Sequence, residues 1–326
     1  MIKKSIKIIC ITFSCFIYSC SQGNKEQKQN NTIQTKTEDM MISEIEQKVN
    51  SFSSRPYYSV DFDNSNSGCQ FEILINDIPV AKKIGIGGAL TSSAPINSCI
   101  LNSGKQKLKI KLYPNIGKNQ LTVSDKNTPL FTLSIAYRKD AWDYNDINEV
   151  LVFQLPSIPI PESGLPYFEK EFEFDAEVPY QFEGWSNSKD LTKVADIEQK
   201  VLDKYKEIQR LLANKDYSTF EKMKKQKDSE MNISFYLKPN EIIEGVKFDK
   251  DAFTEKNAVV QPLDNAKVVF YGYNRLVTLE NISDKGSALR TKIKHEAKDG
   301  KVKEETIKFP ILFHMSQNSD ELEVIR

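Results

Sequence analysis

An alternation of apolar and polar side chains with a period of two runs through the chain between residues 57 and 155. In the clearest stretch, Leu108, Ile110 and Leu112 alternate with Lys107, Lys109 and Lys111. Successive side chains of a β-strand point to opposite faces, so this pattern predicts strands with one buried face and one solvated face. A chain with this pattern must bury one face of a sheet against another layer.

Clusters of turn-forming residues separate the alternating segments at 64–68, 102–104 and 125–129. Short strands with turn clusters at this spacing are typical of a β-sandwich, which we assign to residues 51–158. Four prolines then crowd eleven residues between Pro156 and Pro166. Prolines cannot sustain a central strand, so we place a domain boundary between residues 158 and 159.

The second half of the chain, residues 159–326, combines helical and strand periodicity. Apolar residues recur at helical spacing from Val194 to Leu212 and predict a long helix that ends by Asn214. Asp216 or Ser218 can cap a second helix, which gives a helical hairpin. Further strands are predicted at 168–185, 232–237, 267–271, 275–280, 288–295, 303–313 and 322–325, with a tight Asp-Gly turn at 298–301.

The expected fold is therefore mostly β, in two domains. An N-terminal β-sandwich precedes an α+β domain in which the helical hairpin packs on an antiparallel sheet.

The first twenty residues have the layout of a secretory signal. Three lysines occur within the first seven residues, and an apolar run of ten residues, too short to span a bilayer, precedes Ser19 and Cys20. The sequence Ile17-Tyr18-Ser19-Cys20 resembles the lipobox of bacterial lipoproteins, although Tyr18 replaces the usual small residue. The resemblance implies a signal peptide at 1–19 and a diacylglyceryl group on Cys20. The alternative is a plain signal peptide that leaves Cys20 as a thiol.

Residues 20–50 link the predicted lipid to the folded body. The segment from Ser21 to about Thr37 contains almost no apolar residue, so we expect a flexible tether there. Ile42, Ile45 and Val49 then recur at helical spacing and predict a short helix where the body begins.

Two cysteines remain in the exported body, Cys69 and Cys99. An oxidising compartment favours a disulfide between them, and the alternative is two separate buried thiols. A disulfide is typical of a periplasm, and Ser21 after the lipidated cysteine is compatible with outer-membrane sorting. We therefore expect a protein of the cell envelope, anchored by lipid and facing the periplasm from the outer membrane.

Charge and motifs exclude several functions. Lysine plus arginine equals aspartate plus glutamate at 45 each, which leaves no basic excess for nucleic acid. The sequence contains no P-loop, Rossmann glycine pattern, hydrolase nucleophile elbow or zinc-protease motif. Its two histidines, His295 and His314, lie at the ends of predicted strands and are too few for a typical zinc site. We expect no catalytic residue, metal or cofactor.

One acidic and aromatic loop is a candidate ligand site. Trp142, Asp143, Tyr144 and Asp146 would place aromatic rings beside carboxylates, a combination used in glycan recognition. A solvated loop whose aromatic rings point into the core explains the same residues.

Residues 70–113 weakly resemble the jelly-roll accessory domains of carbohydrate enzymes. The likeness rests on Ile75-Asn76-Asp77-Ile78-Pro79-Val80, on Pro95-Ile96-Asn97 and on Ser103-Gly104-Lys105-Gln106-Lys107-Leu108. It implies a β-sandwich and identifies no binding residue, since Gly104-Lys105 replaces the usual Gly-Asn.

From these observations we expect a lipid-anchored, non-catalytic module that binds a periplasmic protein, such as an immunity or assembly factor. The alternative is a lipoprotein that binds or processes carbohydrate.

Overall fold

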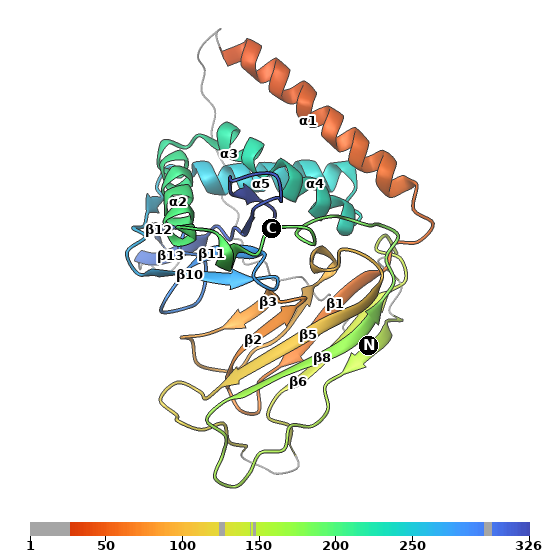
Figure 1. Cartoon of the computed structure of the whole chain (residues 1–326), viewed down its shortest axis with the longest axis vertical. Helices are drawn as coiled ribbons and strands as arrows, with labels where there is room; N and C mark the ends of the chain where they lie inside the picture. Colours follow the sequence, from red (N-terminus) through yellow and green to blue (C-terminus); the bar gives the residue numbers. More distant parts are fainter. Residues whose placement is uncertain (1–26, 124–127, 144, 146–147, 297–301) are drawn as a thin grey trace.

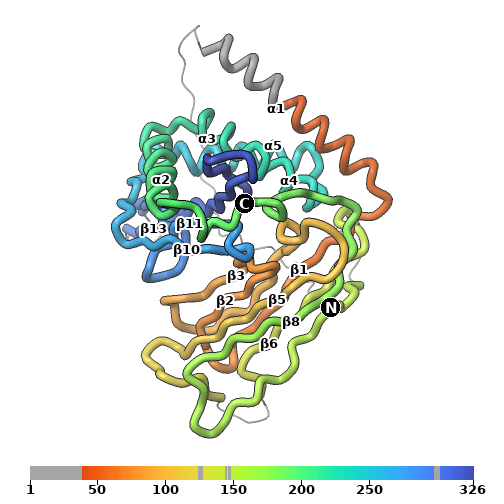
Figure 2. Tube along the Cα trace, in the orientation of Figure 1, coloured from red at the N-terminus to blue at the C-terminus, as the bar shows by residue number. Residues whose placement is uncertain are grey.

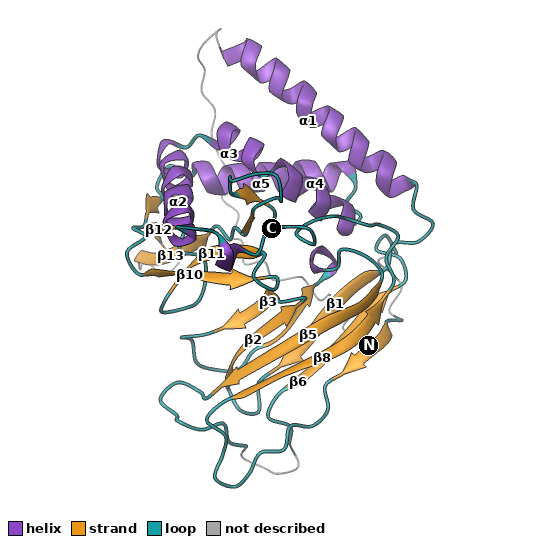
Figure 3. Cartoon of the chain, in the orientation of Figure 1, coloured by secondary structure: helices purple, strands orange, loops and turns teal. Residues whose placement is uncertain are grey.

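The computed structural model describes residues 27–123, 128–143, 145, 148–296 and 302–326, with side chains from residue 39 onward (Figures 1 and 2). The fold is mostly β, with a helical layer above the sheets of the C-terminal half (Figure 3). A β-sandwich followed by an α+β region confirms the predicted fold class. None of the helices in the described part of the chain is both long and apolar enough to cross a membrane.

The β-sandwich consists of two antiparallel four-stranded sheets that share one hydrophobic core. The first sheet has the order β4 (Thr91–Pro95), β1 (Tyr57–Asp63), β6 (Thr132–Arg138) and β7 (Val150–Gln154). The second has the order β3 (Ile78–Lys83), β2 (Gln70–Ile75), β5 (Gly104–Tyr113) and β8 (Phe168–Ala176).

The alternation in β5 buries one face of the strand and leaves the other in solvent, as predicted. Leu108, Ile110 and Leu112 are fully buried between the sheets. The lysines face outward, where Lys107 pairs with Glu171 of β8 at 2.9 Å. Opposite charges on the neighbouring strands β5 and β8 support the pairing of these two strands.

Strand β8 lies in a different domain from the one predicted. It pairs with β5 along its whole length, from Leu112↔Phe168 to Gly104↔Ala176. The proline-rich segment is therefore a loop within the sandwich, where Leu165 exchanges backbone hydrogen bonds with Leu121. The sandwich extends to Ala176, past the predicted boundary at 158/159, because prolines indicate an interruption of strands without specifying which sheet the chain enters next.

The C-terminal half contains two further antiparallel sheets. One has the order β10 (Ala266–Tyr271), β11 (Leu276–Asn281), β14 (Phe313–His314) and β15 (Glu323–Val324). The other has the order β13 (Val302–Lys308), β12 (Arg290–Glu296) and β9 (Val259–Val260). The predicted turn at 298–301 lies outside the described residues.

Helix α2 (Ile197–Asn214) matches the predicted helix, and its apolar face packs on β11 and β14. Helix α3 (Tyr217–Met223) follows and is capped by Asp216, whose side chain accepts the amide of Thr219 at 3.1 Å.

The strand predicted at 232–237 is wrong, because α4 (Lys225–Ser234) and a turn occupy this segment. Helix α5 (Pro239–Thr254) was not predicted, although its start carries a helix signal. Pro239 occupies the first turn, and Glu241 accepts the backbone N–H of Lys238 at 2.8 Å.

The tips of two hairpins join the sandwich to the C-terminal half. The backbone oxygen of Asp77 accepts the amide of Gly272 at 3.1 Å, and its carboxylate accepts the amide of Tyr273 at 3.0 Å. Asn76 and Asp77 both have positive φ, which is the conformation of a two-residue hairpin turn.

Below these tips lies a buried ionic network. Lys82 of β3 donates to Glu280 of β11, and Lys285 donates to Glu72 of β2 at 2.5 Å. The network therefore connects the two halves through ion pairs that cross between them.

The predicted disulfide does not form, since both cysteines are buried free thiols. Cys69 directly precedes β2, whereas the carbonyl of Cys99 accepts a hydrogen bond from Asn76 at the other end of this strand, at 2.8 Å. At about 3.3 Å per residue, β2 separates the two cysteines by about 20 Å, and a disulfide requires Cα atoms within about 7 Å.

Helix α1 (Gln27–Asn50) confirms the predicted helix before the body and is longer than expected. It begins within the segment predicted as a tether. Ile45 and Val49 are each 1% exposed and pack with Tyr180, Tyr236 and Ile242. Its last turns thus lie against both the sandwich and the helices (Figure 1).

Candidate functional site

The predicted acidic and aromatic loop contributes one side chain to a pocket. Trp142 lines this pocket, whereas Asp143 is exposed and accepts the amide of Asn145 at 3.0 Å. Tyr144 and Asp146 lie outside the described residues. The structure thus places Trp142 of this candidate set in the site.

Trp142 is held from two sides. Its indole N–H donates to the backbone oxygen of Tyr236 at 2.7 Å, in the turn between α4 and α5. Tyr236 has a φ of 56°, the left-handed conformation that ends α4. The Arg55 guanidinium lies over the Trp142 ring, 4.0 Å from its centroid, which is the geometry of a cation–π contact.

Arg55 is fixed in turn by Asp140. Two hydrogen bonds, of 3.0 and 2.8 Å, join the guanidinium to this carboxylate, which also accepts the amide of Trp142 at 2.9 Å. The hydrogen bonds from Arg55 hold the pKa of Asp140 below its usual value against a smaller opposing effect of burial. Trp142 is therefore preorganised by contacts far apart in the sequence.

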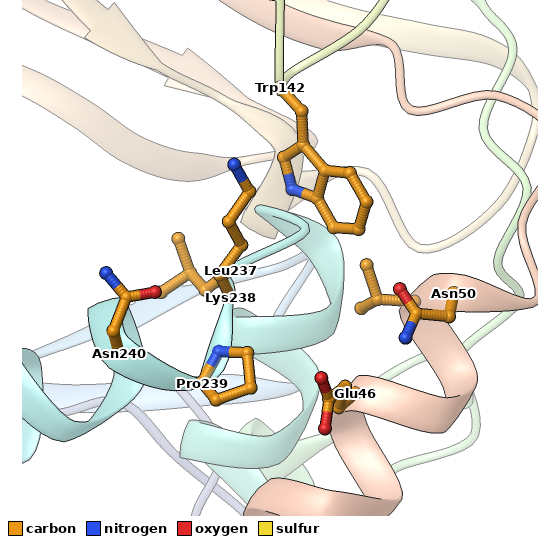
Figure 4. Close-up of a pocket in the computed structure, with 8 residues that line it drawn as sticks. Glu46, Asn50, Trp142, Leu237, Lys238, Pro239 and Asn240 are labelled. Atoms are coloured by element: carbon orange, nitrogen blue, oxygen red, sulfur yellow. The ribbon is translucent and has the colours of Figure 1, made fainter.

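The pocket lies where α1, the Trp142 loop and the start of α5 meet, and it has a volume of about 280 Å³ (Figure 4). Trp142 points into it between Lys238 and Asn50. The lining residues are Glu46, Val49, Asn50, Trp142, Leu237, Lys238, Pro239 and Asn240.

The polar lining combines one carboxylate, one ammonium group and two amides. Glu46, Asn50 and Asn240 are exposed, and the Lys238 ammonium lies 5.2 Å from the centroid of the Trp142 ring. These groups can donate and accept hydrogen bonds and can pair with either charge. The lining contains no histidine, cysteine, serine or second carboxylate, and its only ionisable side chains are Glu46 and Lys238.

Sequence reasoning identified Trp142 and missed the other seven lining residues. Glu46 and Asn50 are four residues apart on α1, on the face next to the buried Ile45 and Val49. Pro239 and Glu241 form a helix-start pattern from which the beginning of α5 could have been predicted. Nothing in the sequence brings these segments to Trp142, because their contact depends on the packing of α1 against α4 and α5.

A larger and more open hollow of about 660 Å³ lies between α2 and the segment after β9. Leu202, Ala213, Val260 and Leu263 give it an apolar floor, with Lys206, Arg210 and Asp264 among the polar residues around it. It contains no residue predicted to have a function.

The remaining chemistry-bearing side chains lie elsewhere. Ser188 Oγ and His314 Nδ1 are 2.8 Å apart, but both residues are 4% exposed and neither lines a described pocket. Burial lowers the pKa of His314, so its ring is neutral at pH 7. Within the described residues, no group of three or more His, Cys, Asp or Glu side chains is placed to hold a metal ion.

Comparisons with known protein families, with curated proteins and with solved structures find no match to this chain. The interpretation of the site therefore depends on its geometry.

Proposed function

We propose that this protein is a non-catalytic binding module of the bacterial cell envelope, anchored by a lipid on Cys20, and that its Trp142 pocket receives a segment of a periplasmic protein. The lining of the pocket is the observation that supports this proposal. Its charges and amides match the mixed polar groups of a protein surface, and Trp142 supplies a large rigid contact.

Preorganisation favours binding at this pocket. Arg55, Asp140 and the Tyr236 carbonyl fix the indole ring before any ligand arrives. A contact that is already ordered loses less entropy on binding. Immunity and assembly factors both fit such a role, since each requires recognition without chemistry.

Carbohydrate binding is the competing proposal. Sugar rings stack on an open aromatic face, whereas two cations already lie over the Trp142 ring, with the Arg55 guanidinium 4.0 Å and the Lys238 ammonium 5.2 Å from its centroid. The protein-binding proposal has no such requirement, because the edge of the ring and the amides of the rim provide its contacts. The geometry therefore favours a protein ligand.

The test is affinity capture of the tagged full chain from detergent-solubilised envelope, with quantitative mass spectrometry. We compare wild type with Glu46→Lys, which reverses a charge in the pocket, and with Glu44→Lys, an exposed residue of α1 that does not line the pocket. A protein recovered in near-equal amount with wild type and Glu44→Lys, and lost with Glu46→Lys, supports the proposal.

Two results count against it. A partner that is retained equally by all three chains binds elsewhere. Cell-wall or polysaccharide fragments recovered in place of a protein would favour the carbohydrate proposal.

A further inference from the structure

Strand β7 forms one edge of the first sandwich sheet. It pairs with β6 through Tyr137↔Val150, Ala136↔Leu151, Ile135↔Phe153 and Ser134↔Gln154, and among the described strands none pairs with its other side. Because an antiparallel strand directs alternate backbone groups to either side, part of the β7 backbone faces the open side. Such an edge is a template for a further strand.

The other edge strands of the described sheets carry devices that oppose pairing. Strands β8 and β13 contain several charged residues, and β10 contains Lys267. Strands β3 and β4 contain Pro79 and Pro95, and β9 and β15 have only two residues each. Charge, proline and short length are the usual means by which an edge avoids association.

Strand β7 has none of these features. Its sequence is Val-Leu-Val-Phe-Gln, without charge or proline. Leu151 is 57% exposed, whereas Val152 and Phe153 pack against the core of the sandwich. Among the edge strands of five or more residues that the structure describes, β7 alone is uncharged and free of proline.

We propose that β7 pairs antiparallel with β7 of a second copy of this chain, about a two-fold axis, and joins the two first sheets into one. An uncharged strand can face itself without like-charge repulsion, which the edges at β8 and β13 cannot do. A two-fold interface uses the same patch on both copies, so it closes at the dimer.

The dimer is weak and reversible. Five residues span about 17 Å, and pairing over that length buries less than the roughly 1,200 Å² of a stable interface. Val152 is an extra residue between the pairs at Ile135 and Ala136, and this bulge shortens the regular ladder. A shared membrane surface would raise the effective concentration of the copies.

Sedimentation equilibrium of the full chain in mild detergent tests this proposal. We expect wild type to dimerise reversibly at concentrations up to about 100 µM. Leu151→Lys should raise the dissociation constant at least about tenfold, because it places a charge on each facing strand. The matched control is Val302→Lys on β13, where a 71% exposed valine occupies another edge, and it should dimerise like wild type.

Two further measurements separate a loss of dimerisation from a loss of folding, and dimerisation from the sharing of a detergent micelle. The melting temperature of Leu151→Lys should equal that of wild type, because the side chain lies on the surface. The Cys20→Ser chain should still dimerise, which shows that the association does not come from a shared micelle. A wild-type chain that is monomeric at all concentrations would overturn the proposal, as would a dimer unaffected by Leu151→Lys.

Discussion

The buried pair of Lys82 and Glu280 gives the sharpest prediction about how the two halves hold together. Glu280 is 5% exposed, and the side chain of Lys82 is 14% exposed. Lys82 also donates to the hydroxyl of Tyr271 at 2.6 Å, and this hydroxyl donates to Glu280 at 2.7 Å. Burial lowers the pKa of Lys82, although the charges of Glu280 and Glu72 oppose that effect.

The substitution Lys82→Met removes the cation and keeps an unbranched apolar side chain in its place. Of the two hydrogen-bond donors to Glu280 named above, the Tyr271 hydroxyl then remains, and the carboxylate stays buried without its cation. Breaking a buried ion pair in this way costs about 3 to 5 kcal/mol, because one charge stays unpaired. At about 2 to 4 °C per kcal/mol, the melting temperature should fall by about 6 to 20 °C.

The double variant Lys82→Met/Glu280→Gln decides whether the unpaired charge is the cause. Glutamine can still accept the hydrogen bond from Tyr271, so no buried charge is left and most of the stability should return, to within about 1 kcal/mol of wild type. The assay is thermal and urea unfolding followed by fluorescence of the two tryptophans. As control, Lys105→Met removes an exposed partner of Glu173 and should leave the unfolding curve unchanged.

Two outcomes would refute this reasoning. One is a fall of less than about 2 °C for Lys82→Met, which would mean that water reaches the pair. The other is a double variant as unstable as the single variant, which would assign the loss to packing.

Three further predictions concern pH, thiols and the anchor. Burial would raise the pKa of Asp284, but hydrogen bonds from Arg290 and Lys308 outweigh it and hold that pKa well below its usual value. This carboxylate therefore stabilises the fold at neutral pH and ceases to do so as the pH falls through its folded pKa. Asp284→Asn should be less stable than wild type at pH 7 in urea unfolding, with the gap narrowing below about pH 4; a gap independent of pH contradicts this. Burial raises the pKa of the Cys99 thiol to about 11, so Cys69 and Cys99 should react with alkylating reagents only after unfolding and appear as unlinked peptides without reductant. A linked peptide in mass spectrometry would contradict this and support a disulfide between Cys69 and Cys99. Cys20→Ser should lose metabolic fatty-acid labelling and membrane association, and an unlabelled wild-type chain would remove the anchor from the proposed function.

The local patterns in the sequence were sufficient for most of the elements. Alternation identified β1, β2 and β5 because a two-residue period is a property of the strand itself. The 3.6-residue period identified α2, whose Val201, Tyr205 and Ile208 are fully buried as expected. The strand predicted at 232–237 failed because a short apolar run does not distinguish a strand from the end of a helix.

The candidate site was predictable in one residue. Trp142 stood out as an exposed-loop aromatic beside carboxylates, but its partners come from Arg55, Tyr236 and α1. Contacts across such sequence separations leave no local periodicity, so the pocket could not be found from the chain alone.

The sequence by itself determined the class of fold, the two-layer β architecture and the main helix, because each depends on the periodicity or composition of neighbouring residues. Tertiary structure decided which sheet β8 joins and the separation of Cys69 from Cys99. It also decided the burial of Lys82 with Glu280 and the formation of the Trp142 pocket. These features depend on which surfaces pack together in three dimensions, and packing joins residues whose spacing along the chain carries no record of their contact.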